Sequence, residues 1–193
     1  KEIIEFNNEL GSSLPFISEN GATIKGLDLL NSNLPKELIL SKEKSNLIKI
    51  FEKSVPIDMQ KKCKWLSNMD KKKQGVIFGL EDYKLEMALD RKYTIPFIFD
   101  GNKNEKKELS RIIKKKGLAL QEGGRVINLT DKVSKAKALQ VFVRFFKKNN
   151  ENIKIIAVGD NYNDLDMLKI SDFPCLVFND KFTLDEIPIN NLI

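Results

Sequence analysis

Apolar positions along the 193-residue chain recur in two ways, and each predicts one kind of secondary structure. Apolar residues three and four apart predict amphipathic helices, and short continuous apolar runs predict buried strands. The predicted helices are 1–10, 43–52, 57–68, 81–91, 105–115 and one that opens at Ser134. The predicted strands are 93–99, 118–121, 125–129, 153–158 and 175–178. Because strands and helices alternate, the pattern favours α/β layers over a helical bundle.

Polar side chains gather at the end of the strand predicted at 153–158. A glycine ends the apolar run, and two carboxylates and two carboxamides follow within five residues: Asp160, Asn161, Asn163 and Asp164. Open α/β sheets bind ligands at the carboxyl ends of their strands, and Mg²⁺ prefers oxygen ligands such as these. We therefore predict a magnesium site here. The alternative is a plain strand-to-helix turn, since Asp and Asn also cap helices.

The helix that opens at Ser134 carries Lys135 in its first turn. Its apolar residues are three and four apart and predict one buried face: Ala138, Val141, Phe142 and Phe145. The helix dipole favours acidic residues in a first turn, so helix stability does not explain a lysine there. We predict that Lys135 pairs with a phosphate group, with a solvated lysine as the alternative.

Composition excludes several kinds of active site. The chain has no histidine, which rules out Ser-His-Asp catalysis, a Cys-His nucleophile pair and a histidine-rich zinc site. Cys63 and Cys175 are far apart in sequence and fit reduced thiols in a cytoplasmic protein. No apolar run approaches membrane-spanning length, so we expect no membrane partner.

The formal net charge of +6 makes nucleic acid a partner to consider. The basic residues are scattered among acidic ones, and no basic stripe with interleaved aromatic residues is present. We therefore expect solvated surface lysines, no nucleic-acid partner and a small-molecule substrate.

The motifs together resemble the second half of a haloacid dehalogenase-type phosphatase. The resemblance lies in the order Ser134-Lys135-Ala136-Lys137-Ala138, a helix, a strand and the run Gly159–Asp164. Segment 14–22 is similar to the strand and Glu-Asn-Gly turn that lead into the large α/β cap of one subgroup. Within that subgroup, segments 78–96 and 117–125 resemble the mannosyl-3-phosphoglycerate phosphatases.

The resemblance implies a Rossmann-like parallel-sheet core with an inserted α+β cap. It assigns residues 1–25 and 131–193 to the core and residues 26–130 to the cap, which would set substrate specificity. Family members carry an Asp-x-Asp-Gly-Thr segment with the nucleophile, and these 193 residues lack it, so we expect it upstream of Lys1. Ile95 is a further departure, because mannosylphosphoglycerate phosphatases commonly have a glutamate before this proline.

The function implied by the resemblance is Mg²⁺-dependent hydrolysis of a phosphorylated sugar or sugar acid, with mannosyl-3-phosphoglycerate favoured, through an aspartyl-phosphate intermediate. Asp160 and Asp164 would serve the metal, and Lys135 and Asn163 would be catalytic. The substrate-binding residues would be Asn20, Arg91, Gly123, Gly124 and Arg125. A structural ion pair is the alternative for each arginine. Alternative functions are another sugar-phosphate phosphatase of the superfamily and a non-catalytic α/β binding module.

Overall fold

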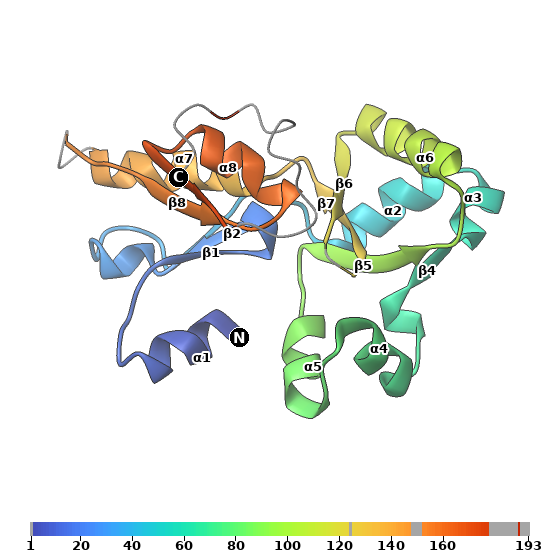
Figure 1. The fold of residues 1–193 in the computed structure, drawn as a ribbon, viewed down its shortest axis with the longest axis horizontal. Coiled ribbons are helices and arrows are strands. Elements are labelled where there is room, and N and C mark those ends of the chain that lie inside the picture. The colour runs from blue at the N-terminus through green and yellow to red at the C-terminus, as the bar shows by residue number, and fades with distance from the viewer. Residues whose placement is uncertain (1, 124, 148–151, 178–188, 190–193) are drawn as a thin grey trace.

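The computed structural model describes residues 2–123, 125–147, 152–177 and 189. Two groups of elements lie side by side and are joined by thin connections (Figure 1). Within the described part of the chain, no helix combines the length and the apolar character needed to cross a membrane.

The first group contains two small sheets. An antiparallel sheet is formed by β1 (Phe16–Ser18), β2 (Thr23–Lys25) and β3 (Glu37–Ile39), and a parallel pair by β8 (Ile156–Gly159) and β9 (Phe173–Leu176). The helices of this group are α1 (Glu2–Glu9), α7 (Lys135–Lys147) and α8 (Leu165–Lys169). Ala138 of α7 is buried against Ile24 and Leu27, and the predicted apolar face of α7 packs on the same cluster. The predicted amphipathic helix is therefore confirmed.

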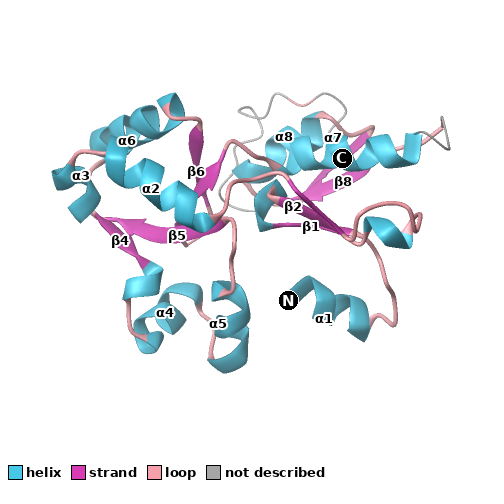
Figure 2. Ribbon diagram, turned by 180° about the vertical axis from the view of Figure 1, so that it is seen from behind, coloured by secondary structure: helices cyan, strands magenta, loops and turns pink. Residues whose placement is uncertain are grey.

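The second group is built on a four-stranded antiparallel sheet in the order β4-β5-β7-β6. The strands are β4 (Cys63–Trp65), β5 (Thr94–Phe99), β6 (Leu118–Glu122) and β7 (Ile127–Asp131). The helices are α2 (Lys44–Ser54), α3 (Ile57–Lys61), α4 (Lys71–Phe78), α5 (Asp82–Leu89) and α6 (Lys103–Lys115). Helices α2 and α6 lie on one side of the sheet, and α4 and α5 lie beyond the other (Figure 2).

The two faces of this sheet differ in polarity because successive strand residues point to opposite faces. One face packs against α2 and α6 through Ile95, Phe97 and Leu129, which are all buried. The other face carries Thr94 and Thr130, both fully buried and paired across β5 and β7. The sheet therefore has an apolar face toward α2 and α6 and a polar face directed away from these two helices.

Several predicted elements differ from the structure. The helix predicted at 57–68 is wrong beyond Lys61, because residues 63–65 form β4, where Cys63 is buried in the apolar cluster and Trp65 packs against it. Helix α4 was not predicted; the Asp70 side chain caps it by accepting a hydrogen bond from the Lys73 backbone N–H at 2.9 Å. The strand predicted at 125–129 begins at Ile127, and position 178 of the last predicted strand lies outside the described residues.

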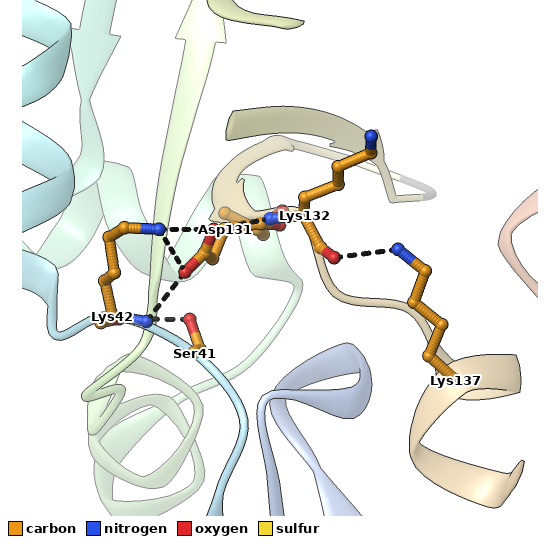
Figure 3. A network of polar contacts seen from close by, with 6 residues as sticks. Ser41, Lys42, Asp131, Lys132 and Lys137 are labelled. Carbon is orange, nitrogen blue, oxygen red and sulfur yellow. Dashed lines mark hydrogen bonds and ion pairs between the residues drawn. The ribbon is translucent and has the colours of Figure 1, made fainter. Parts of the chain in front are cut away.

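Lys42 and Asp131 join the two chain segments that pass between the groups (Figure 3). Lys42 lies between β3 and α2, and Asp131 ends β7. The Lys42 Nζ lies 3.0 and 2.8 Å from the two Asp131 carboxylate oxygens, and the Lys42 and Lys132 backbone N–H groups donate to the same carboxylate at 2.9 and 2.8 Å. Burial raises the pKa of the Asp131 carboxyl, but these hydrogen bonds outweigh burial and hold the pKa below its usual range.

A small apolar cluster and a carboxylate reinforce the same junction. Tyr93, just before β5, packs with Ala22 and Val133 of the first group. The Glu19 carboxylate accepts hydrogen bonds from the backbone N–H groups of Lys92 and Tyr93, each at 2.9 Å. The turn after β1 is therefore tied to the start of β5.

Candidate active site

Asp164 organises the loop that follows β8. The chain turns after Gly159 through the short helix η4 (Tyr162–Asp164), and Asp164 is only 4% exposed. Its carboxylate accepts hydrogen bonds from the backbone N–H groups of Asp160 and Asn161, at 3.3 and 3.2 Å. A Cβ at Gly159 would lie 2.5 Å from the Asp164 Cβ, so a side chain at position 159 would displace Asp164.

Lys135 meets this loop from the start of α7. Its Nζ lies 2.6 Å from Asp164 Oδ1, and the two side chains are 33% and 5% exposed. A buried carboxylate needs such a partner, because an unpaired charge is costly inside a protein. An ammonium group has three hydrogen atoms to donate, so this ion pair leaves Lys135 able to bind a second anion. The structure thus brings together two motifs that are distant in sequence.

Gly21 places the start of α7 against the turn that follows β1. Its φ is +97°, in the region that favours glycine, and a Cβ there would lie 2.5 Å from the Ser134 carbonyl carbon. The Ser134 Oγ accepts a hydrogen bond from the Lys137 backbone N–H at 3.2 Å, which caps α7 as predicted. The position of Lys135 therefore depends on a close backbone contact that only glycine permits.

The donors at this loop fit part of a magnesium ligand set. Asp160 is exposed at the carboxyl end of β8. The buried Asp164 carboxylate accepts hydrogen bonds from Lys135 and from the Asp160 backbone N–H. Among the described residues, no group of three or more His, Cys, Asp or Glu side chains could hold a metal ion. Mg²⁺ commonly takes only one or two carboxylates from a protein and completes its shell with water and phosphate, so Asp160 and Asp164 are compatible with it.

A cavity of about 610 Å³ lies between η4 and β6. The described residues that line it are Leu120, Gln121, Glu122, Gly123, Asn161, Tyr162 and Asn163. Two residues predicted for the site, Asn163 and Gly123, therefore lie on one cavity beside the acidic loop. Gly124 lies outside the described residues.

Asn20 and Arg91 line a different cavity, of about 410 Å³, together with Glu19 and Lys25. The Arg91 Nε donates a hydrogen bond to the Ala88 carbonyl at 2.7 Å, which secures the side chain at the end of α5. The structure thus brings Asn20 and Arg91 together, but on a cavity separate from the one at η4.

Arg125 is exposed and lies at the C-terminal end of α4. A Cβ built on Gly79, the residue directly after α4, would lie 3.0 Å from the Arg125 Cζ. A cation is favourable at a helix C-terminus, so this location has a structural explanation as well. The structure therefore places the Arg125 guanidinium against the turn that follows α4.

Sequence reasoning missed two polar residues near the site, Gln121 and Glu19. Gln121 lies on the polar face of the four-stranded sheet, opposite Asn128 in the register of β6 and β7. The Glu19 carboxylate also accepts a hydrogen bond from Thr94 Oγ1 at 3.0 Å, which adds to its two bonds with the backbone before β5. Polar residues alternate with apolar ones in β7, at Asn128 and Thr130, which was a signal for a polar sheet face; the partners of Glu19 lie more than 70 residues away in sequence.

The chain matches the haloacid dehalogenase-like hydrolases over residues 1–186 and belongs to that family. This confirms the family that the motifs resemble. Within it, the chain is 30% identical to the glucosyl-3-phosphoglycerate/mannosyl-3-phosphoglycerate phosphatase of Persephonella marina over 200 residues, which cover 97% of this chain and 73% of that protein. It is also 26% identical to the mannosyl-3-phosphoglycerate phosphatase of Pyrococcus horikoshii over 173 residues, covering 86% of this chain and 69% of the relative.

Solved structures support the same fold class. A Thermoplasma acidophilum protein superimposes with a TM-score of 0.60 at 15% identity, covering 91% of this chain and 64% of its own. A haloacid dehalogenase-like hydrolase from B. subtilis gives a TM-score of 0.59 at 15% identity, covering 91% of this chain and 73% of its own. The predicted α/β fold with an inserted cap is thus confirmed.

Proposed function

We propose that the complete protein is a Mg²⁺-dependent phosphatase that hydrolyses the phosphate ester of a glycosylated 3-phosphoglycerate, such as the mannosyl or glucosyl derivative. The ion pair between Lys135 and the buried Asp164 carries the proposal, because it sets a cation and an acidic loop at one strand end. The names of the Persephonella marina and Pyrococcus horikoshii relatives support the choice of substrate.

We also propose a division into core and cap. The sheet of β1 runs through β3 to Ile39, so we place the first boundary near residue 40, later than the predicted boundary at residue 25. The cap would then comprise α2 through β7, and the second boundary would follow Asp131, one residue later than the predicted boundary between residues 130 and 131. In this arrangement the polar face of the cap sheet meets the acidic loop.

The visible residues would position and neutralise the phosphoryl group. Phosphoryl transfer depends mainly on positioning and charge stabilisation. Lys135 would pair with the phosphate while Asp164 holds its ammonium in place, and the Asn163 amide N–H groups would donate to a phosphate oxygen. Asp160, supported by Asp164, would hold Mg²⁺, which supplies charge neutralisation when bound. The nucleophile would be an aspartate from a segment outside these 193 residues.

The test is Asp160→Ala in the complete protein, with Asp166→Ala as the matched control. Asp166 is an exposed carboxylate on the helix that follows, 4.0 Å from Lys169. Loss of a metal ligand should lower kcat/KM for a phosphomonoester by about a thousandfold or more, equivalent to several kcal/mol of transition-state stabilisation. The control should retain activity, and both variants should show an unchanged circular dichroism spectrum. Near-normal turnover by Asp160→Ala would refute the metal assignment.

A further inference from the structure

Two residues that line the cavity between η4 and β6 each carry a buried carbonyl oxygen for which the described residues supply no hydrogen-bond donor. Gln121 Oε1 and Asn163 Oδ1 are buried, and neither has a hydrogen-bond partner among the described residues. Both residues line the same cavity, one from β6 and the other from η4. A buried acceptor that lacks its bond costs about 1–3 kcal/mol, so two on one cavity call for a donor that is not part of the described chain.

The orientation of the Gln121 amide follows from its other hydrogen bond. Its Nε2 donates to the Val133 carbonyl at 2.9 Å, and a carbonyl can accept only from the nitrogen end of the amide. Oε1 is therefore the unpaired end. The backbone of Gln121 is fixed by the pairing of β6 with β7, opposite Asn128, which is 5% exposed. Gln121 therefore presents Oε1 as a fixed acceptor, because a flip of its amide would break the hydrogen bond to the Val133 carbonyl.

The charges around the cavity decide which ligand it suits. The described residues that line it include no lysine or arginine, and they include the carboxylate of Glu122, which is paired with Lys106 at 2.8 Å. A phosphate or carboxylate offers acceptors and negative charge, which two carbonyl oxygens would repel. A hydroxyl group has a hydrogen atom to donate and no charge. The lining therefore suits the neutral, hydroxyl-rich part of a ligand.

We propose that this cavity binds hydroxyl groups of the glycosyl part of the substrate, and that Gln121 helps to determine specificity by accepting a hydrogen bond from one of them. The inference rests on the proposed function and deepens it, because it assigns the sugar and not the anionic end to this cavity. Asn163 would serve both groups, donating to phosphate through its amide nitrogen and accepting from a sugar hydroxyl through Oδ1. Both oxygens have less than 1 Å² of accessible surface, so a sugar hydroxyl would reach them only after a local rearrangement of the cavity lining.

The test compares Gln121→Met with Gln140→Met in the complete protein. Methionine keeps the length of the side chain and removes the acceptor, and Gln140 is an exposed glutamine on α7. Gln121→Met should lower kcat/KM for mannosyl-3-phosphoglycerate at least tenfold and change that for p-nitrophenyl phosphate less than twofold. Equal losses on both substrates, or no loss on either, would overturn the assignment. Gln121→Asn, which withdraws the amide by one methylene, gives the same comparison if the methionine variant fails to fold.

A binding measurement separates this inference from the phosphatase proposal. Calorimetric titration of the complete protein with mannosylglycerate should show binding that Gln121→Met weakens at least tenfold and Gln140→Met leaves unchanged. Glycerate, which lacks the glycosyl hydroxyls, should bind all three proteins equally. This pattern would support the sugar cavity even if the wild type hydrolysed no phosphomonoester. Equal mannosylglycerate affinity in all three proteins would overturn the inference even if phosphatase activity were present.

Discussion

At the scale of single residues, Asp164 shows how one carboxylate can serve both the fold and the site. It bonds to two backbone N–H groups of its own loop and to the ammonium of Lys135. The loop conformation and the lysine position therefore depend on the same buried charge. A charge this deeply buried is stabilised only while its partners are present.

Replacing Lys135 with methionine should destabilise the protein. The variant leaves the Asp164 carboxylate buried without its cation, which should lower the free energy of unfolding by about 2 kcal/mol. Lys137→Met, two residues further along α7, is the control, because Lys137 is exposed and donates to the Lys132 carbonyl at 3.0 Å. Urea denaturation of both variants gives the comparison. Similar free energies for the two variants would mean that the ion pair contributes little to the fold.

At the scale of elements, the position of α7 depends on its contact with the turn after β1. Gly21 lies against the Ser134 carbonyl, so the strand, the turn and the helix fit together only without a side chain at position 21. Lys135 follows directly, and a shift of the helix start would move its ammonium away from Asp164. The glycine of the Glu-Asn-Gly turn therefore acts on the site through packing.

Gly21→Ala should cost clearly more stability than Gly117→Ala. Both glycines have positive φ, +97° and +74°, so each alanine meets a backbone cost of about 1–2 kcal/mol. A Cβ at Gly117 meets nothing within 4 Å, whereas one at Gly21 overlaps the backbone of Ser134. The overlap should add about 1–3 kcal/mol, measured as the difference in free energy of unfolding. Equal losses would show that α7 can move away at little cost.

Local sequence predicted the helices that carry their own signals. Helix α6 has a capping box between Asn102 and Glu105 and a clear apolar face, and it forms close to the predicted bounds. Residues 62–68 have no such signals, and their conformation is set by pairing with β5, which is more than 30 residues away. The acidic loop could be predicted from the sequence because its four polar residues lie within five positions. The unpaired acceptor of Gln121 could not be predicted in this way, because it depends on the sheet register and on the Val133 carbonyl.

At the scale of the whole molecule, the Lys42–Asp131 pair fixes the two chain segments that connect the two groups of elements. These segments are 89 residues apart in sequence and meet at one carboxylate. The pKa of that carboxyl is held below its usual range, so the folded state favours the ionised form. The pair therefore contributes stability above the unfolded pKa of aspartate, about 3.9, and loses it as the pH falls through the lower folded value.

Asp131→Asn should be less stable than the wild type at pH 7, and the difference should shrink as the pH falls below about 4. Asp100→Asn, at an exposed carboxylate after β5, is the control and should differ little from the wild type at pH 7. Urea denaturation between pH 3 and pH 7 measures both. A difference for Asp131→Asn that is independent of pH would show that the carboxylate charge is not what holds the segments together.

The sheet of β4 to β7 has a consequence for the order of folding. All four of its strands and the helices that cover it come from the continuous segment between Lys44 and Asp131. The cluster under α7, in contrast, joins Ile24 and Leu27 to Ala138, across more than 100 residues of chain. Closing so long a loop carries a larger entropy cost than pairing nearby strands. The continuous segment should therefore collapse first, and its completed sheet then brings the two ends of the chain close enough for α7 to dock.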